Sequence, residues 1–221
     1  MEEYRQTTGF ILADRPDHLR LKLQVLAMTV FDMASNGQEY RASIPIKNLF
    51  LIADANAPGT SSNPLGNLRP RHMLEALFVD IRPMLGNPMI KPAIEETVVG
   101  RTSYYVISFV DFSGDWAQVK EKIWIDRTRM EIVRKQIFLA DGKLESDVEF
   151  SGYQKVGDVS FPLVVEMQRP IEEYSLKMTF QLPSLKLNGM LPGESFELER
   201  PAGSQLVENP GKPPMKREKI D

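Results

Sequence analysis

The sequence predicts a mainly β protein of the α+β class, built from an antiparallel meander or barrel. Apolar and polar residues alternate along most of the chain, and Asn-Gly and Asp-Gly dipeptides separate two pairs of alternating segments. Turn residues recur about every ten residues, a spacing typical of antiparallel sheets. A helical period is clear in one segment alone, so helices are expected to be few.

The alternation is clearest in residues 18–25, where Leu19, Leu21 and Leu23 share one face of the expected strand. Asn36-Gly37 and Asp141-Gly142 are the strongest hairpin signals. A further turn is expected at residues 126–129. The last short strand is expected at residues 195–201.

The helical segment covers residues 70–82. Its apolar residues recur at helical spacing, and they are Met73, Leu74, Leu77, Phe78 and Ile81. Pro70 suits the first turn, and Pro83 is expected to end the helix because proline disfavours helical geometry in the residue before it. No linker interrupts the chain, so residues 1–203 are expected to form one domain. The remaining residues, 204–221, belong to a proline-rich stretch expected to be a disordered tail.

The composition excludes several classes of site. The chain has 221 residues, no cysteine and two histidines, which excludes disulfides, thiolate nucleophiles and cysteine-based metal sites. No metal or cofactor is therefore expected. The formal net charge of −3 is unfavourable for nucleic-acid binding. No apolar run is long enough to span a membrane, and no secretory signal is visible at the start.

Candidate catalytic groups are few, and the sequence predicts a protein that is not an enzyme. Carboxylates that are adjacent on a strand point to opposite faces and are usually solvated. The acidic candidates are Glu95-Glu96, Glu172-Glu173, Asp14 and Asp17. His18 at a strand start and His72 on the polar side of the helical segment are both interpreted as surface residues.

The apolar inventory is richer than the catalytic one. A sheet whose strands each carry one apolar face must cover that face, and a helix of about a dozen residues is too short to cover seven or more strands. The chain also contains eleven methionines, whose flexible side chains suit a variable apolar guest. The rest of the face is expected to be covered by the proline-broken segment that follows the helix, by a helix absent from this chain, by a partner or by a ligand. Two interpretations of the methionines stay open: they adapt to an apolar guest, or they fill gaps in an ordinary core.

Several short motifs occur in a characteristic order. A strand that begins at Gly9 ends in Arg15-Pro16, and the hairpin at residues 35–37 leads into a strand that ends at Pro45. The closing motif has the form Phe-x-Leu-x-x-Pro-x-Gly, with Phe196, Leu198, Pro201 and Gly203. In this order the sequence resembles the periplasmic lipoprotein-carrier superfamily. That superfamily includes the LolA- and LolB-type carriers and the outer-membrane lipoprotein-sorting proteins.

The resemblance implies a strongly curved antiparallel sheet that forms an incomplete barrel, with one or two helices in or over its concave face. It also implies an apolar cavity for lipid acyl chains, and a periplasmic or outer-membrane-associated location. Arg15 matches the arginine that holds the helical lid closed in LolA-type carriers. The family's signal peptide, first helix and first strand are absent, so the chain is expected to be most of a longer envelope protein.

The leading hypothesis is a non-enzymatic carrier or binder of lipoprotein acyl chains or other lipid-like ligands, whose partners are lipids, lipidated proteins and other envelope proteins. Strand alternation and the helical stripe give the expected lining of the cavity: Phe10, Leu12, Leu21, Leu23, Met33, Ile44, Met73, Leu77, Phe78, Ile107, Ile123, Leu176 and Met178. The alternative is an envelope interaction or sensing module that holds a protein segment on the same sheet or pairs with it at a strand edge.

Overall fold

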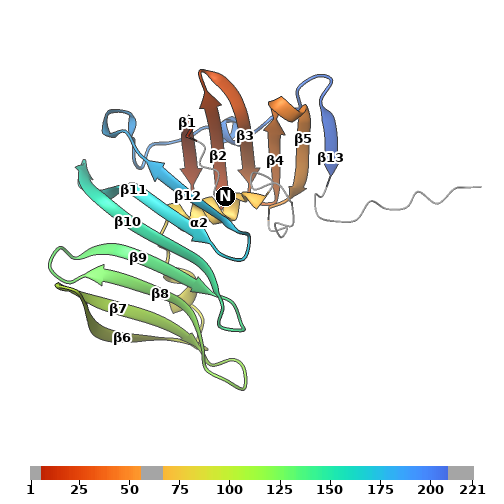
Figure 1. Ribbon diagram of the computed structural model, residues 1–221. Coiled ribbons are helices and arrows are strands. Elements are labelled where there is room, and N and C mark those ends of the chain that lie inside the picture. The colour runs from red at the N-terminus through yellow and green to blue at the C-terminus, as the bar shows by residue number, and fades with distance from the viewer. Residues whose placement is uncertain (1–5, 56–66, 209–221) are drawn as a thin grey trace, which may run out of the picture. The chain divides into compact units, whose positions relative to one another are not determined.

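The computed structural model describes residues 6–55 and 67–208 (Figure 1). The chain divides into two compact units. The first unit comprises residues 1–75 and 190–221, and the second comprises residues 76–189. Each unit contains one sheet, so the strands divide between a six-stranded and a seven-stranded sheet.

The first unit contains the six-stranded sheet, in the order β1-β2-β3-β4-β5-β13. Neighbouring strands are antiparallel except β13, which runs parallel to β5. The strands are β1 (Thr8–Asp14), β2 (His18–Val25), β3 (Met28–Asn36), β4 (Glu39–Ile44), β5 (Leu49–Asp54) and β13 (Gln205–Glu208). Two 3-10 helices accompany them, η1 (Pro45–Lys47) and η3 (Gly193–Phe196).

The second unit contains the seven-stranded sheet, whose strands follow chain order from β6 to β12 (Figure 1). The strands are β6 (Ile90–Val99), β7 (Thr102–Asp111), β8 (Gln118–Asp126), β9 (Glu131–Phe138), β10 (Leu144–Val156), β11 (Val159–Arg169) and β12 (Tyr174–Thr179), and η2 (Leu182–Ser184) follows them. All neighbours are antiparallel. In the described residues each sheet keeps two open edges. The expected class, mainly β with few helices and no closed barrel, is confirmed.

The turn chemistry of the sequence is found where it was expected. Gly37 and Gly142 adopt positive φ values of 87° and 81° in the hairpins β3–β4 and β9–β10. In the β8–β9 turn, the Asp126 carboxylate accepts hydrogen bonds from the backbone N–H groups of Thr128 and Arg129, each at 2.9 Å. The bond from the Arg129 backbone is the main reason why the pKa of Asp126 is lowered.

The helical region is shorter than the predicted 70–82. Helix α2 (Pro70–Leu77) ends before Phe78, and a second short helix, α3 (Arg82–Leu85), follows. The prediction that Pro83 ends the first helix is wrong, because Pro83 lies in the first turn of α3. Asp80 marks this restart, since its carboxylate accepts the Arg82 backbone N–H at 3.1 Å.

The closing motif is not a strand, contrary to the prediction for residues 195–201. It begins in η3 and continues as irregular chain to β13, so residues 205–208 of the expected tail are part of the sheet. Residues 209–221 lie outside the described residues. Leu198 packs with Ala34 and Phe50, and side chains of the sheet satisfy the backbone of the irregular segment.

Arg20 anchors that segment. Its guanidinium donates two hydrogen bonds to the Asp32 carboxylate, at 2.8 and 2.9 Å, and one to the Glu197 carbonyl. Arg41 donates to the Leu198 carbonyl at 3.4 Å. These arginines bond to backbone carbonyls that have no strand partner in the irregular segment, and so hold it on the sheet.

Gly9, which leads the first strand, gives a test of this packing. A Cβ atom added at Gly9 would lie 2.0 Å from the Lys22 carbonyl oxygen, so the strands β1 and β2 would have to separate. We expect Gly9→Ala to lower the free energy of unfolding by about 1–3 kcal/mol, as overpacking does elsewhere. Gly114→Ala is the control, because no atom lies within 4 Å of its added Cβ. Urea unfolding of both variants measures the difference, and equal effects would contradict the packing described.

Candidate functional site

A row of directly opposed side chains crosses the whole seven-stranded sheet. Cross-strand partners point to the same face, so the register places one residue of every strand side by side. This apolar row consists of Ile94, Ile107, Ile123, Lys135, Val148, Met167 and Leu176. Six of its seven members are apolar. The expected lining residues Ile107, Ile123 and Leu176 belong to it, and Met178 lies two residues along β12 on the same face.

A short segment covers part of this row. Ile90, Phe109 and Ile123 form a buried cluster, against which three side chains of the preceding segment pack: Val79, Ile81 and Met84. We call residues 79–84 the cover segment. Helix α3, which supplies its last residues, also contacts β6. The row is therefore buried near its middle, whereas Ile94 at one end is 69% exposed.

A buried charge pair lies on the same face. Lys135, a member of the row, has its Nζ 3.9 Å from Glu121 Oε1, and both side chains are almost completely buried. The same Nζ donates a hydrogen bond to the Phe78 carbonyl at 3.3 Å. Lys135 therefore joins the sheet to the chain just before the cover segment. Burying an isolated ammonium is strongly disfavoured, and these two contacts offset part of that cost.

Arg169 is a second buried charge on this face. It follows Met167 by two residues, is 1% exposed, and pairs with Glu172 at 2.8 Å and Glu145 at 3.2 Å. The planar guanidinium can bond to both carboxylates at once, which fixes the β11–β12 turn against β10.

The opposite face of the seven-stranded sheet is polar. Arg134 donates to the Asp147 carboxylate at 2.7 Å, and its guanidinium lies 6.0 Å from the centre of the Trp124 ring. The hydrogen bond to Asp147 is the main cause of the raised pKa of Arg134. The face of the row is therefore mainly apolar, apart from the buried charged groups of Lys135, Glu121 and Arg169, and the opposite face carries the ion pair of Arg134 beside Trp124.

The six-stranded sheet has an apolar row of its own, made of Ile11, Leu21, Met33, Ala42, Leu51 and Val207. The expected lining residues Leu21 and Met33 are members. Leu23 and Ile44 lie two residues further along their strands, on the same face. Tyr40 is buried there beneath the Arg69 guanidinium, 5.2 Å from the ring centre, and burial raises the pKa of its hydroxyl.

Two residues of the expected lining lie on the other face. Phe10 pairs with Lys22 and Leu12 pairs with Arg20, so both belong to the face with the charged residues. In β1 the positions on the apolar face are Ile11 and Ala13. The run of apolar residues in this strand does not alternate, so sequence alone does not decide which of them point toward the apolar face.

The expected lid residues have different environments. Met73 is fully buried in α2, whereas Leu77 and Phe78 are half-buried. Arg15 is exposed in the turn between β1 and β2, and its control of a lid stays a prediction. The sequence analysis missed Lys135 and Glu121. The available signal was a lysine at an apolar position of the alternating strand 131–138.

Two hollows in the described part of the surface lie away from the predicted lining. One of about 500 Å³ lies beside the β7–β8 and β9–β10 turns, and its wall includes Trp116, Val119, Lys122 and Phe138. Another of about 260 Å³ lies beside Asp54 and Glu208. Neither of these two contains an expected lining residue.

Residues 6–55 and 67–208 contain neither a cluster of metal-ligating side chains nor a membrane-spanning helix. No group of three or more His, Cys, Asp or Glu side chains in these ranges could hold a metal ion. No helix within them is long and apolar enough to cross a membrane.

No protein-family model matches the chain, and no curated protein matches it significantly. Solved structures do match. A DUF1329 family protein from Desulfovibrio piger has a TM-score of 0.52 at 11% identity, over 86% of this chain and 80% of that one. The fold of this chain is similar to that of the DUF1329 family protein.

Two further matches have TM-scores of 0.49. One is a LolA superfamily protein from Nitrosomonas europaea, at 9% identity over 87% of this chain and 81% of that one. The other is an outer membrane lipoprotein-sorting protein domain from Vibrio parahaemolyticus, at 13% identity over 82% of this chain and 79% of that one. The resemblance indicated by the sequence motifs is confirmed, and it is a resemblance of fold.

The buried pair gives a quantitative test. Lys135→Met leaves the Glu121 carboxylate without the nearby ammonium, so we expect a loss of about 3–5 kcal/mol in the free energy of unfolding. Combining it with Glu121→Leu is expected to recover most of that loss, because the uncompensated charge is then removed. The measurement is urea unfolding of both single variants and the double variant.

The exposed pair Lys177–Glu166 is the matched control, with a 2.7 Å contact and both side chains mostly in solvent. Lys177→Met is expected to cost less than about 1 kcal/mol. A Lys135→Met loss no greater than this would show that the buried pair does not hold the sheet and the Phe78 carbonyl together.

Proposed function

We propose that the protein binds or carries lipid-like ligands, such as the acyl chains of lipoproteins, without catalysing a reaction. The observation that supports this most directly is the apolar row that crosses all seven strands of one sheet beneath a short cover segment. The LolA-like fold supports it as well. The ligand would lie along the row, in contact with Ile123, Met167 and Leu176.

The binding energy would come from apolar burial. Each buried methylene contributes about 0.8 kcal/mol, so an acyl chain gains affinity with its length rather than with specific contacts. Met167 and Met178 on the same face can adapt their shape to chains of different length.

The cover segment would set access to the row. Val79, Ile81 and Met84 bury the same kind of surface that an acyl chain would bury, so the two compete for one site. Displacing the segment exposes its apolar residues, while the ligand buries apolar groups of its own. The free energy of this exchange is therefore expected to be small. The Lys135 bond to the Phe78 carbonyl would keep the segment attached beside the open site.

The remaining parts of the proposal follow from the resemblance. The protein would work in the periplasm or at the outer membrane, and its partners would be lipids, lipidated proteins and other envelope proteins. Arg15 would control opening. Arg15→Ala in the binding assay described next tests that role, because it should change the rate of ligand exchange and leave the number of sites unchanged.

The binding assay uses dansylaminoundecanoic acid, a fatty acid whose fluorescence rises in apolar surroundings, with delipidated protein. We expect saturable binding. Leu176→Asp is expected to weaken it at least about tenfold, because a carboxylate would then have to be buried beside the chain. Ser175→Asp, one residue away on the polar face, is expected to change it less than about twofold.

Circular dichroism of each variant shows whether the fold is retained. Two results would contradict the proposal: no saturable binding by folded wild-type protein, or equal effects of the two substitutions. Native mass spectrometry of the purified protein adds a direct readout, since retained peptide in place of lipid would favour a protein segment as the natural ligand.

The competition between ligand and cover segment has a distinctive consequence. Ile81→Ala weakens the packing of the cover segment, so the same fatty acid is expected to bind more tightly, by about tenfold or more. If a residue only lined the site, its replacement by alanine would weaken fatty-acid binding instead. Fluorescence titration measures the Kd, and weaker binding by folded Ile81→Ala protein would show that Ile81 contacts the ligand instead of competing with it.

A further inference from the structure

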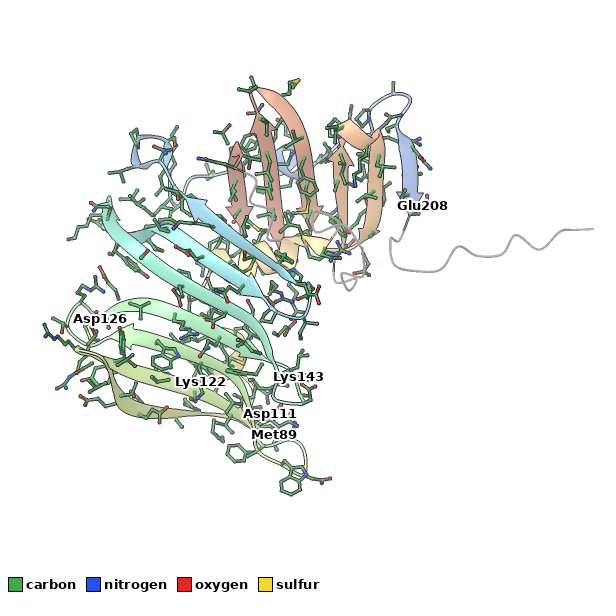
Figure 2. The ribbon with its side chains drawn as sticks, in the orientation of Figure 1. Met89, Asp111, Lys122, Asp126, Lys143 and Glu208 are labelled. Atoms are coloured by element: carbon green, nitrogen blue, oxygen red, sulfur yellow. The ribbon has the colours of Figure 1, made fainter. Side chains whose placement is uncertain are left out.

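Strand β6 is an open edge of the seven-stranded sheet. It has ten residues, whereas the other edge strands, β1, β12 and β13, have seven, six and four. It starts next to Met89, at the end of the sheet that also carries Asp111, whereas Asp126 lies at the other end (Figure 2). A long edge strand offers a row of backbone groups to another chain.

The hydrogen bonds show which backbone groups of β6 point outward. The Phe112 N–H donates to the Met89 carbonyl at 2.9 Å, so residues an even number of positions after Met89 also bond to β7. The residues between them point away. The Ile90 N–H confirms this, because it donates to the Asn87 carbonyl and not to β7.

The outward groups are available from Ile94 to Val98. The backbone groups of Ile94, Glu96 and Val98 point away from β7 and bond to no backbone group in the described part of the chain. Pro92 also occupies an outward position, where its missing N–H costs nothing, and it limits pairing on that side. The edge that can accept a strand is therefore residues 94–98.

The side chains of this edge define the chemistry of an added strand. Ile94 and Val98 lie on the same face and are 69% and 64% exposed. Glu95 points to the opposite face, is exposed, and makes no ion pair with any residue that the structure describes. Apolar residues would fit beside Ile94 and Val98, and a basic residue would fit beside Glu95.

We propose that residues 94–98 of β6 bind an extended segment of a partner protein as an additional antiparallel strand. The segment carries apolar residues four positions apart and a basic residue directly before the second of them. Antiparallel addition continues the pattern of the whole sheet and is the more stable pairing per residue. This interaction uses the backbone groups of the sheet edge, whereas the proposed lipid-like ligand contacts side chains of Ile123, Met167 and Leu176.

The charges favour a different protein over a second copy of this chain. Two copies of β6 paired with Ile94 beside Val98 would place the two Glu96 side chains directly opposite each other. Shifting the register by two residues places Glu96 opposite Ile94 or Val98 instead. The first arrangement keeps the apolar pairing but sets like charges opposite one another, which destabilises a sheet, and the shifted register loses the apolar pairing.

The test uses the full chain, labelled with ¹⁵N, and the acetylated peptide Thr-Val-Thr-Lys-Arg-Ile-Thr. In the protein alone, the amide protons of Ile94, Glu96 and Val98 are expected to exchange rapidly with solvent. Saturating peptide is expected to slow the exchange of these three at least about tenfold, and to leave the outward-facing amides of β12 unchanged. Nuclear magnetic resonance measures both exchange and Kd.

Two variants distinguish the contribution of the Glu96 backbone N–H to peptide binding from that of the Glu96 side chain. Glu96→Pro removes an outward N–H but no bond to β7, as Pro92 already does, and is expected to weaken peptide binding at least about tenfold. Glu96→Ala removes the same carboxylate, keeps the N–H, and is expected to weaken binding less than about threefold. Circular dichroism shows whether both variants fold.

Three results would overturn the proposal. The first is the absence of saturable peptide binding. The second is slow exchange of the three amides without peptide, which would show that the edge is already covered. The third is equal binding by folded Glu96→Pro and Glu96→Ala proteins. None of these results depends on fatty-acid binding, so the edge and the apolar row are tested separately.

Discussion

The structure depends on the burial of one apolar face on each open sheet. Alternation gives every strand an apolar side, and the register aligns these sides into rows that cross six strands in one unit and seven in the other. Since neither sheet closes on itself within the described residues, its core cannot form inside a barrel. Segments outside the sheets must supply the missing layers. The cover segment does so over β6–β8. The closing motif packs on the other face of the six-stranded sheet, where Leu198 contacts Ala34 and Phe50, and not on the row that contains Leu21 and Met33.

Buried charges give these covering segments defined positions. Apolar packing is non-directional and tolerates small shifts, whereas a guanidinium or ammonium fixes the groups that it bonds. Arg20 holds the Glu197 carbonyl in one unit, and Lys135 holds the Phe78 carbonyl in the other. Burying Lys135 costs more free energy than burying Arg20, because Lys135 lies in an otherwise apolar row. The Lys135 bond lies just before the cover segment, and Val79, Ile81 and Met84 of that segment pack on the sheet through apolar contacts.

An open sheet provides two kinds of interaction surface. Its apolar face can exchange a cover for a ligand of similar chemistry, and its edge can add a strand through backbone hydrogen bonds. The two use different forces, so one protein can hold an apolar guest and a protein partner at the same time. In β6 the residues that define the edge, Ile94 and Val98, also extend the apolar face to its limit.

The sequence by itself determined the fold class, both glycine hairpins and the strand face to which Ile107, Ile123, Leu176 and Met178 point, because each rests on local geometry or on two-residue periodicity. It did not determine the face of Phe10 and Leu12. In an unbroken run of apolar residues, hydrophobicity does not show which alternate positions point to the core. Only the tertiary structure decided that helix α2 stops at Leu77, that residues 205–208 join the sheet, and that Lys135 meets Glu121 and the Phe78 carbonyl. These features depend on contacts between residues far apart in the chain, and neither the composition nor the spacing of one segment specifies its distant partner.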